Sequence, residues 1–360
     1  MLPRTGLAVA LVLLLAGCSA TTAPSSAPAV VPLDPAAPLT SLKFLTDPHS
    51  YIGQSTAVLA DASITASPPA QSLPVTVTSH DLAGATQVTV TSTARIIAMD
   101  ISGSIAATVF GLGLGGNVVA RDESTTFPEA AALPVITSSA HTVNSEAILA
   151  LRPTVVLTDG SIGPVDVVLQ LREAGVPVVF VHNAPSLDGV GGLAREVGDA
   201  LGAEAAGSTL AAALASGIAA KVSEIAGIVP SGVPLRMLFL YLRGNSGIYY
   251  LFGEGSGEDV LVHSLGGVDV AAQIGLTGMK PMTDEAMVAA NPDLILVMTD
   301  GLASVGGVSG LLSAQPAIAL TKAGQHHRFV NMQDGEILGF GPRTAAVLDA
   351  LARAVYAPGQ

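Results

Sequence analysis

The chain has 360 residues, of which 49% are hydrophobic and only 12% are charged, so apolar residues suffice for the cores of two domains. The formal net charge is −13 and the sequence has no basic stripe, which argues against nucleic acid as a partner. The only cysteine is Cys18, which excludes an intramolecular disulfide.

The N-terminus has the pattern of an export signal. Arg4 precedes an apolar stretch over residues 7–15, which is shorter than the ~20 residues of a membrane-spanning helix. The stretch ends in Leu15-Ala-Gly-Cys18, which resembles a bacterial lipoprotein signal, where the cysteine is diacylated. We therefore expect a signal peptide over residues 1–18, lipidation at Cys18, and anchoring at the extracytoplasmic face of the cytoplasmic membrane.

The next segment, residues 19–73, has no periodic pattern. Proline, serine and alanine dominate residues 19 to about 40 and predict a flexible tether, while residues 41–73 stay unassigned. Apolar and hydroxyl residues then alternate over 74–79 and 87–92, which predicts a β-hairpin with one buried face. This hairpin opens an N-terminal lobe over residues 74–188.

Strands alternate with helices in this lobe, which predicts a mostly parallel sheet. Strands are expected at residues 95–100, 117–120, 133–136, 154–158 and 178–181, and helices at 105–112, 145–151 and 165–174. Ser102 is placed to cap the first helix. Residues 111–116 fit G-x-G-x-x-G, but they follow a helix and precede a strand, so they predict a turn and not a dinucleotide site.

A long apolar-periodic stretch over residues 189–227 has no proline and predicts a linking helix. As one helix it would span on the order of 50 Å and would form a rigid strut between two lobes. The alternative is two helices broken near Gly207.

The C-terminal lobe, residues 228–360, resembles the first. Residues 142–160 and 281–301 match in register: Glu146 aligns with Glu285, Pro153 with Pro292, and both copies end in Thr-Asp-Gly. The fold class is therefore α/β, with two similar α/β lobes of mostly parallel sheets, one long rigid helix between them, and a ligand in the interlobe cleft. In this lobe strands are expected at 235–242, 248–252, 268–271, 294–298 and 328–331, and helices at 259–264, 284–290, 308–312, 316–319 and 342–356.

Three features fall at the carboxyl ends of strands, where open α/β sheets bind ligands. His141 lies in the loop before the repeated helix and corresponds by register to Lys280 in the equivalent loop of the second lobe. It is a candidate ligand, or a loop histidine bonded to nearby serines. Arg343 in Gly339-Phe-Gly-Pro-Arg343 opens the last helix, where it can hold a carboxylate or simply follow a proline-started helix.

Tyr241 and Arg243 end the first strand of the second lobe. Residues i and i+2 share one face of a strand, so the two side chains should lie side by side. A guanidinium within hydrogen-bond reach favours a phenolate, and a phenolate is a hard oxygen donor suited to ferric iron. The alternative is an edge tyrosine beside a solvated arginine.

Over residues 74–360 the chain resembles the haem-binding lipoprotein of bacterial haem ABC importers, the HmuT type. The motifs that carry this resemblance begin at Arg95, Arg121, Leu133, Glu146 and Gly339. The resemblance implies haem as cargo, with Tyr241 and His141 as axial ligands, Arg243 supporting the phenolate, and Arg343 or Lys280 at a propionate. It also implies a monomer that is not an enzyme and docks to an ABC permease through one acidic residue per lobe, for which Glu129 and Glu258 are the candidates.

Other functions compete with this one. A ferric-siderophore or cobalamin binder belongs to the same class. A surface-anchored hydrolase would need Ser102 or Ser246 to pair with His141, but no nucleophile-elbow motif is present. A zinc or manganese binder would gather several histidines and carboxylates, whereas only His141 is placed at the cleft among His49, His80, His141, His182, His263, His326 and His327. Titration with hemin separates these functions.

Overall fold

The computed structural model describes residues 37–59, 64, 66–81, 83–138 and 141–359. The chain divides into two units, residues 1–31 and 32–360, and all described residues belong to the second. The predicted signal peptide, Cys18 and most of the tether lie outside the described residues.

The N-terminal lobe is built on a parallel sheet in the order β5-β4-β6-β7. Its strands are β4 (Ile96–Met99), β5 (Val118–Arg121), β6 (Val155–Thr158) and β7 (Val178–Phe180), and its helices are α1 (Ser104–Gly111), α2 (Ser145–Ala150) and α3 (Val165–Glu173). The predicted hairpin is present as antiparallel β2 (Val75–Asp81) and β3 (Gly84–Val90). The strand expected at 133–136 is reduced to one bridge between Arg121 and Val135.

The cap of α1 differs from the prediction. The N-cap residue is Gly103, and the buried carboxylate of Asp100 accepts the backbone N–H groups of Ser104 and Ile105 at 3.0 and 2.9 Å. The Ser102 hydroxyl donates to that same carboxylate. Asp100 follows β4 directly, so it satisfies the free N–H groups that Ser102 was expected to cap.

The linking segment forms two helices, so the prediction of one helix over 189–227 was wrong. Helix α4 (Leu187–Ala200) ends in a turn where Gly202 has φ 66°, and α5 (Glu204–Ile228) follows. The two helices approach closely where Gly198 faces Gly207. A Cβ on Gly198 would lie only 2.7 Å from the Cα of Gly207. Such close contact of two backbones requires glycine on both helices.

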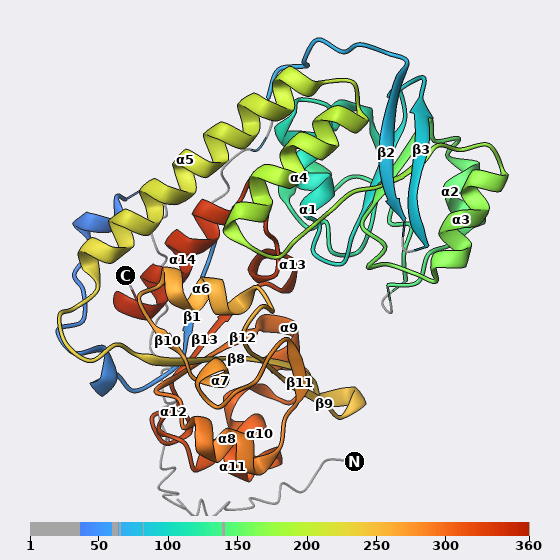
Figure 1. Cartoon of the computed structure of the whole chain (residues 1–360). Helices are drawn as coiled ribbons and strands as arrows, with labels where there is room; N and C mark the ends of the chain where they lie inside the picture. The colour runs from blue at the N-terminus through green and yellow to red at the C-terminus, as the bar shows by residue number, and fades with distance from the viewer. Residues whose placement is uncertain (1–36, 60–63, 65, 82, 139–140, 360) are drawn as a thin grey trace, which may run out of the picture. The chain divides into compact units, whose positions relative to one another are not determined.

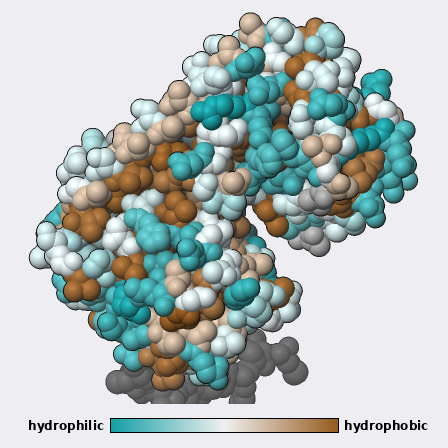
Figure 2. Space-filling view, viewed as in Figure 1, coloured by the Kyte–Doolittle hydropathy of each residue, from teal (hydrophilic) through white to brown (hydrophobic). Residues whose placement is uncertain are grey.

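Helix α5 is the long connection between the lobes, since it packs against α4 at one end and against α14 (Thr344–Tyr356) at the other (Figure 1). By length and composition alone, α5 is also apolar enough to cross a membrane. Its exposed positions are mainly alanine, serine, threonine and glycine, and Figure 2 shows a mostly pale surface along it. The contacts with α4 and α14 explain the position of α5 as the helix that links the two lobes.

The C-terminal lobe contains a sheet in the order β1-β13-β12-β8-β9-β11, with β10 also paired to β8. Strand β9 pairs antiparallel with β8 and with β11, and all the other strand pairs are parallel. The strands are β8 (Arg236–Arg243), β9 (Ile248–Phe252), β10 (Val268–Asp269), β11 (Met279–Pro281), β12 (Leu294–Met298) and β13 (Phe329–Met332). The helices before α14 are α6 (Glu258–Ser264), α7 (Val270–Gln273), α8 (Asp284–Ala290), α9 (Thr299–Ala303), α10 (Gly307–Ala314), α11 (Pro316–Ala319), α12 (Lys322–Gln325) and α13 (Asp334–Ile337).

The internal repeat has a structural counterpart in each lobe. Helix α2 leads through buried Pro153 into β6, and α8 leads through buried Pro292 into β12. Strand β6 pairs in parallel with β4, and β12 pairs in parallel with β8. The prediction of two α/β lobes with mostly parallel sheets is therefore confirmed.

The described residues 37–59 belong to the C-terminal lobe, although they come first in the chain. Strand β1 (Ser55–Thr56) pairs with β13, and Leu39 is fully buried in the core of that lobe. The amide of Leu45 donates to the carbonyl of Tyr356. The short 3₁₀ turns are η1 (Leu39–Ser41), η2 (Pro48–Ser50), η3 (Gly115–Asn117), η4 (Pro128–Ala130) and η5 (Gly244–Ser246).

Candidate ligand-binding site

Tyr241 and Arg243 lie side by side at the carboxyl end of β8, as their spacing predicts. The Tyr241 ring stacks on Phe252 of β9, with centroids 6.0 Å apart and planes 10° apart. The guanidinium carbon of Arg243 lies 4.9 Å from the centroid of the same ring. The arginine contact is therefore with the ring face, whereas the sequence predicted one at the hydroxyl; a cation–π contact of this kind contributes roughly 0.5–1 kcal/mol at an exposed site.

Asp334 holds Arg243 in this position. Its Oδ2 lies 2.8 Å from Nη2 of Arg243, and its Oδ1 accepts the backbone N–H of Asp300 at 3.0 Å. Burial raises the pKa of Asp334, while the Asp300 amide and the Arg243 charge oppose that rise. Sequence reasoning missed Asp334, although its position two residues after β13, at the carboxyl end of a parallel strand, is the signal that identifies it.

The strand register gathers aromatic side chains around Tyr241. Directly paired residues share a sheet face, and Tyr241 pairs with Tyr250 while Phe239 pairs with Phe252. Phe252 in turn pairs with Met279 of β11, which is 52% exposed. This face of β8, β9 and β11 is therefore aromatic and apolar, with Phe239 buried in the core and Tyr241, Tyr250 and Phe252 half-buried.

Lys280 lies in strand β11, so its expected placement in a loop was wrong. It pairs with Leu251, which pairs with Leu240 of β8. Because successive residues of a strand point to opposite faces, Lys280 and Tyr241 project from opposite faces of the sheet. This arrangement separates Lys280 from the Tyr241–Arg243 pair.

His141 has an unusual backbone conformation and an unsatisfied ring nitrogen. Its φ of 53° lies in the left-handed region, and its amide donates to the carbonyl of Ser138 at 2.8 Å. Its Nδ1 is buried with no hydrogen-bond partner among the described residues. Burial raises the pKa of Asp122, and His141 is close enough to oppose that rise. Strained backbone and an unpaired buried nitrogen are features of ligand sites.

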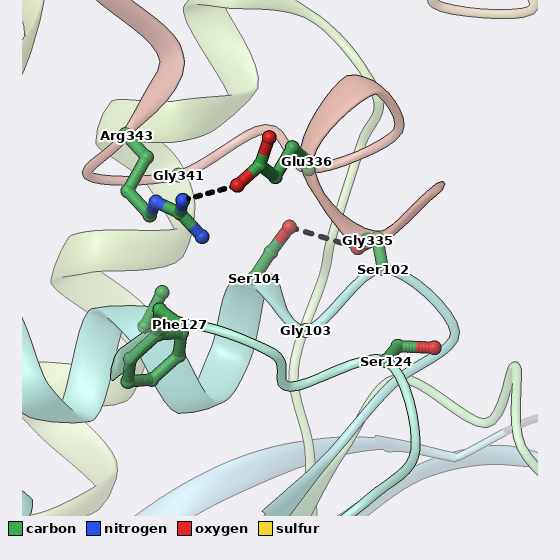
Figure 3. A pocket seen from close by; sticks show the side chains of 11 residues that line it. Ser102, Gly103, Ser104, Ser124, Phe127, Gly335, Glu336, Gly341 and Arg343 are labelled. Carbon is green, nitrogen blue, oxygen red and sulfur yellow. Dashed lines mark hydrogen bonds and ion pairs between the residues drawn. The ribbon is translucent and has the colours of Figure 1, made fainter. Parts of the chain in front are cut away.

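Arg343 lies at a small cavity of about 20 Å³ between the lobes (Figure 3). The residues lining the cavity include Ser102, Ser104 and Phe127 of the N-terminal lobe, and Glu336 and Arg343 of the C-terminal lobe. Arg343 Nη2 lies 2.8 Å from Glu336 Oε1. This space holds about one water molecule, so this cavity does not admit a macrocycle, and the Arg343 charge already has a partner.

The two acidic docking candidates differ in exposure. Glu129 is half-buried and accepts the backbone N–H of Ile64 at 3.0 Å. Glu258 is only 3% exposed, and burial raises its pKa to about 8. The expectation that Glu258 faces a partner protein was therefore wrong, because Gly257 beside it packs against Pro185 and Phe340.

The serines of the hydrolase alternative lack a histidine partner in the described chain. Ser102 Oγ lies 2.6 Å from Asp100 and 2.8 Å from Ser104. Ser246 is exposed in η5. The Ser102 hydroxyl therefore bonds to a carboxylate and another serine and not to an imidazole, so this serine forms no nucleophile–base pair with a histidine.

Residues 100–334 match the family model described as periplasmic binding protein. The chain is 28% identical over 218 residues to the uncharacterised ABC transporter substrate-binding lipoprotein YvrC of Bacillus subtilis. It is 26% identical over 214 residues to a cobalamin-binding protein of Halobacterium salinarum. Both alignments cover 59% of this chain, and they span only 65% and 56% of those relatives' lengths.

Several solved haem-binding proteins share this fold. HmuT matches with a TM-score of 0.78 and 36% identity, covering 86% of this chain and 99% of that chain. The periplasmic haem-binding protein RhuT of Roseiflexus sp. RS-1 matches with a TM-score of 0.66 and 38% identity, covering 74% and 99%. The chain belongs to the periplasmic binding protein family, and within that family it resembles the HmuT-type members.

Proposed function

We propose that this protein captures haem between its lobes at the extracytoplasmic face of the membrane and delivers it to an ABC permease. The observation that carries the proposal is the Tyr241–Arg243 pair, held on an aromatic sheet face. The likeness to HmuT over almost the whole of that chain supports the same cargo.

The chemistry of the residues fits a ferric macrocycle. Tyr241 would supply a phenolate oxygen to the iron, and Arg243 would stabilise its negative charge. The aromatic face would pack against the macrocycle, because a flat apolar ligand needs a flat apolar surface. His141, whose Nδ1 lacks a partner among the described residues, would bind the iron from the opposite side.

Solved variants of HmuT support these assignments. They include proteins in which an arginine, a tyrosine or a histidine is replaced by alanine. The tyrosine and the arginine replaced there lie two positions apart, as Tyr241 and Arg243 do here.

Hemin titration followed by absorption tests the proposal. We expect a sharpened Soret band at one equivalent of hemin in the wild type. Tyr241→Phe removes only the hydroxyl and should weaken affinity at least about tenfold, which corresponds to roughly 1.4 kcal/mol. Tyr249→Phe is the matched control, since Tyr249 pairs with Leu242 on the opposite sheet face. His141→Ala should shift the band by removing one axial ligand.

An unchanged spectrum at stoichiometric hemin would reject haem as cargo. The relative that binds cobalamin makes cobalamin the second candidate. Repeating the titration with cobalamin separates the two, because tight cobalamin binding that Tyr241→Phe leaves intact would favour it. A ferric siderophore is tested in the same way.

Delivery would depend on the anchor and on a docking contact. We expect Cys18→Ser to release the protein from the membrane fraction.

Glu129→Ala should leave hemin binding and membrane attachment unchanged but lower growth on hemin as the iron source. Glu123→Ala replaces another exposed acid of the same lobe and serves as the control. Normal growth of the Glu129→Ala strain would show that Glu129 is not part of the docking surface. In the C-terminal lobe, the exposed Glu254 would be tested in place of the buried Glu258.

A further inference from the structure

Two histidines and a glutamate meet in the N-terminal lobe, on elements separate from those that carry Tyr241 and His141. His80 belongs to β2, His182 follows β7, and Glu196 lies on α4. One ligand atom from each of the three residues lies within 4.8 Å of the other two. Three separate elements thus bring together a His₂Glu set that no local sequence motif contains.

The contacts within this set hold the side chains in place. The imidazole rings of His80 and His182 are in close contact, with centroids 3.7 Å apart and planes tilted by 38°. Glu196 Oε1 lies 2.9 Å from Nδ1 of His182, and Oε2 accepts the backbone N–H of His182 at 2.8 Å. Oε2 also lies 3.9 Å from Nε2 of His80. The carboxylate is therefore already oriented toward both rings.

The donor set matches a first-row divalent cation. Two neutral imidazoles with one carboxylate are a frequent zinc ligand set, in which water completes a tetrahedron. Ligand atoms around such an ion are roughly 3.4 Å apart, given bond lengths of about 2.0–2.2 Å. Since the three ligand atoms lie within 4.8 Å of one another, no pair has to approach by more than about 1.4 Å. The His182 side chain is 64% exposed, so there is solvent space on one side of its ring for this adjustment.

The surroundings favour a positive charge. His80 and Glu196 line an open surface groove together with Asp199 and Glu204. Burial raises the pKa of Asp199, and the neighbouring Glu204 and Glu196 carboxylates raise it further. The groove therefore concentrates negative charge beside the two rings, and because it is open, solvent and ions reach it.

We propose that His80, His182 and Glu196 form a Zn²⁺ site on the N-terminal lobe, separate from the ligand cleft. The ion would join β2, the segment after β7 and α4. Since binding requires the folded arrangement, the ion should stabilise the folded protein.

Zinc titration of the chelator-treated full chain by calorimetry tests the site. We expect one equivalent of Zn²⁺ per chain and a higher melting temperature with the ion bound. His182→Gln and Glu196→Gln should each weaken affinity at least about tenfold, since even residues that only orient metal ligands contribute 10–100-fold. His263→Gln replaces an exposed histidine of α6 and is the matched control.

Three outcomes would overturn the proposal. The first is the absence of stoichiometric binding. The second is binding that His182→Gln and Glu196→Gln both leave intact. The third is binding that His141→Ala or a bound hemin abolishes, because the ion would then occupy the cleft. His182→Gln changes an exposed side chain, so the test does not depend on whether a His80 variant folds.

Discussion

Glu258 shows how burial makes stability depend on pH at the scale of one residue. It begins α6 with 3% of its surface exposed, and burial raises its pKa from 4.5 to about 8. Between these two values the folded chain holds a proton that the unfolded chain releases. The free energy of unfolding should therefore fall as pH rises from about 4.5 to about 8.

Glu258→Gln should remove this dependence, because glutamine keeps the shape and stays neutral. We expect the variant to be more stable than the wild type by at least about 1 kcal/mol at about pH 9, since one pKa unit corresponds to 1.36 kcal/mol, and to match it at about pH 4. Urea unfolding followed by circular dichroism at both pH values measures the difference. Glu254→Gln, at an exposed position, should show no such difference. Equal stabilities at high pH would contradict a raised pKa for Glu258.

At the scale of elements, the crossing of α4 and α5 depends on glycine. A Cβ on Gly207 would lie 2.8 Å from the carbonyl oxygen of Ala194 and 3.1 Å from the Cα of Gly198. These are backbone atoms, so they cannot move aside without separating the helices. Gly217, on the exposed side of α5, has no atom within 4 Å of the same position.

The two glycines should respond to alanine in opposite directions. Gly207→Ala should destabilise by about 1–3 kcal/mol, the usual cost of overpacking, in spite of the higher helix propensity of alanine. Gly217→Ala should stabilise by up to about 1 kcal/mol, because it gains that propensity and meets no clash. Thermal melts of both variants measure the effect. A Gly207→Ala protein as stable as the wild type would show that the helices do not pack as described.

At the scale of the whole described chain, residues 37–59 close the C-terminal lobe before the chain enters the N-terminal lobe. The amide of Ser72 then donates to the carbonyl of Gly202, and the Gln71 side chain donates to the carbonyl of Leu201. The C-terminal lobe is thus assembled from both ends of the described chain, with β1 beside β13.

Leu39→Ala should destabilise the protein by about 2–5 kcal/mol, the range for a large aliphatic residue removed from a core. Leu39 has no exposed surface, whereas Leu320 is 67% exposed. Leu320→Ala should therefore change the free energy of unfolding by less than about 0.5 kcal/mol. Chemical denaturation of the two variants compares them. If Leu39→Ala were equally mild, the N-terminal segment would not belong to the core.

Local pattern predicted most elements of the two lobes. The alternation of strands and helices, the matching helix–proline–strand units around Pro153 and Pro292, and the shared face of Tyr241 and Arg243 all follow from short-range periodicity. These features depend on residues close in sequence, which is why they are readable without coordinates. The same information did not reveal Asp334, since its ion pair with Arg243 joins residues far apart in the chain.

The sequence by itself determined the α/β class and the Tyr241–Arg243 pair, because each depends on a period of two or about 3.6 residues along the chain. It also determined the two similar lobes, because residues 142–160 and 281–301 match in register. Only the tertiary structure decided where the linking helix breaks, that residues 37–59 join the C-terminal lobe, that Glu258 is buried, and that His80, His182 and Glu196 meet. Each of these depends on contacts between segments far apart in sequence, which no local period encodes.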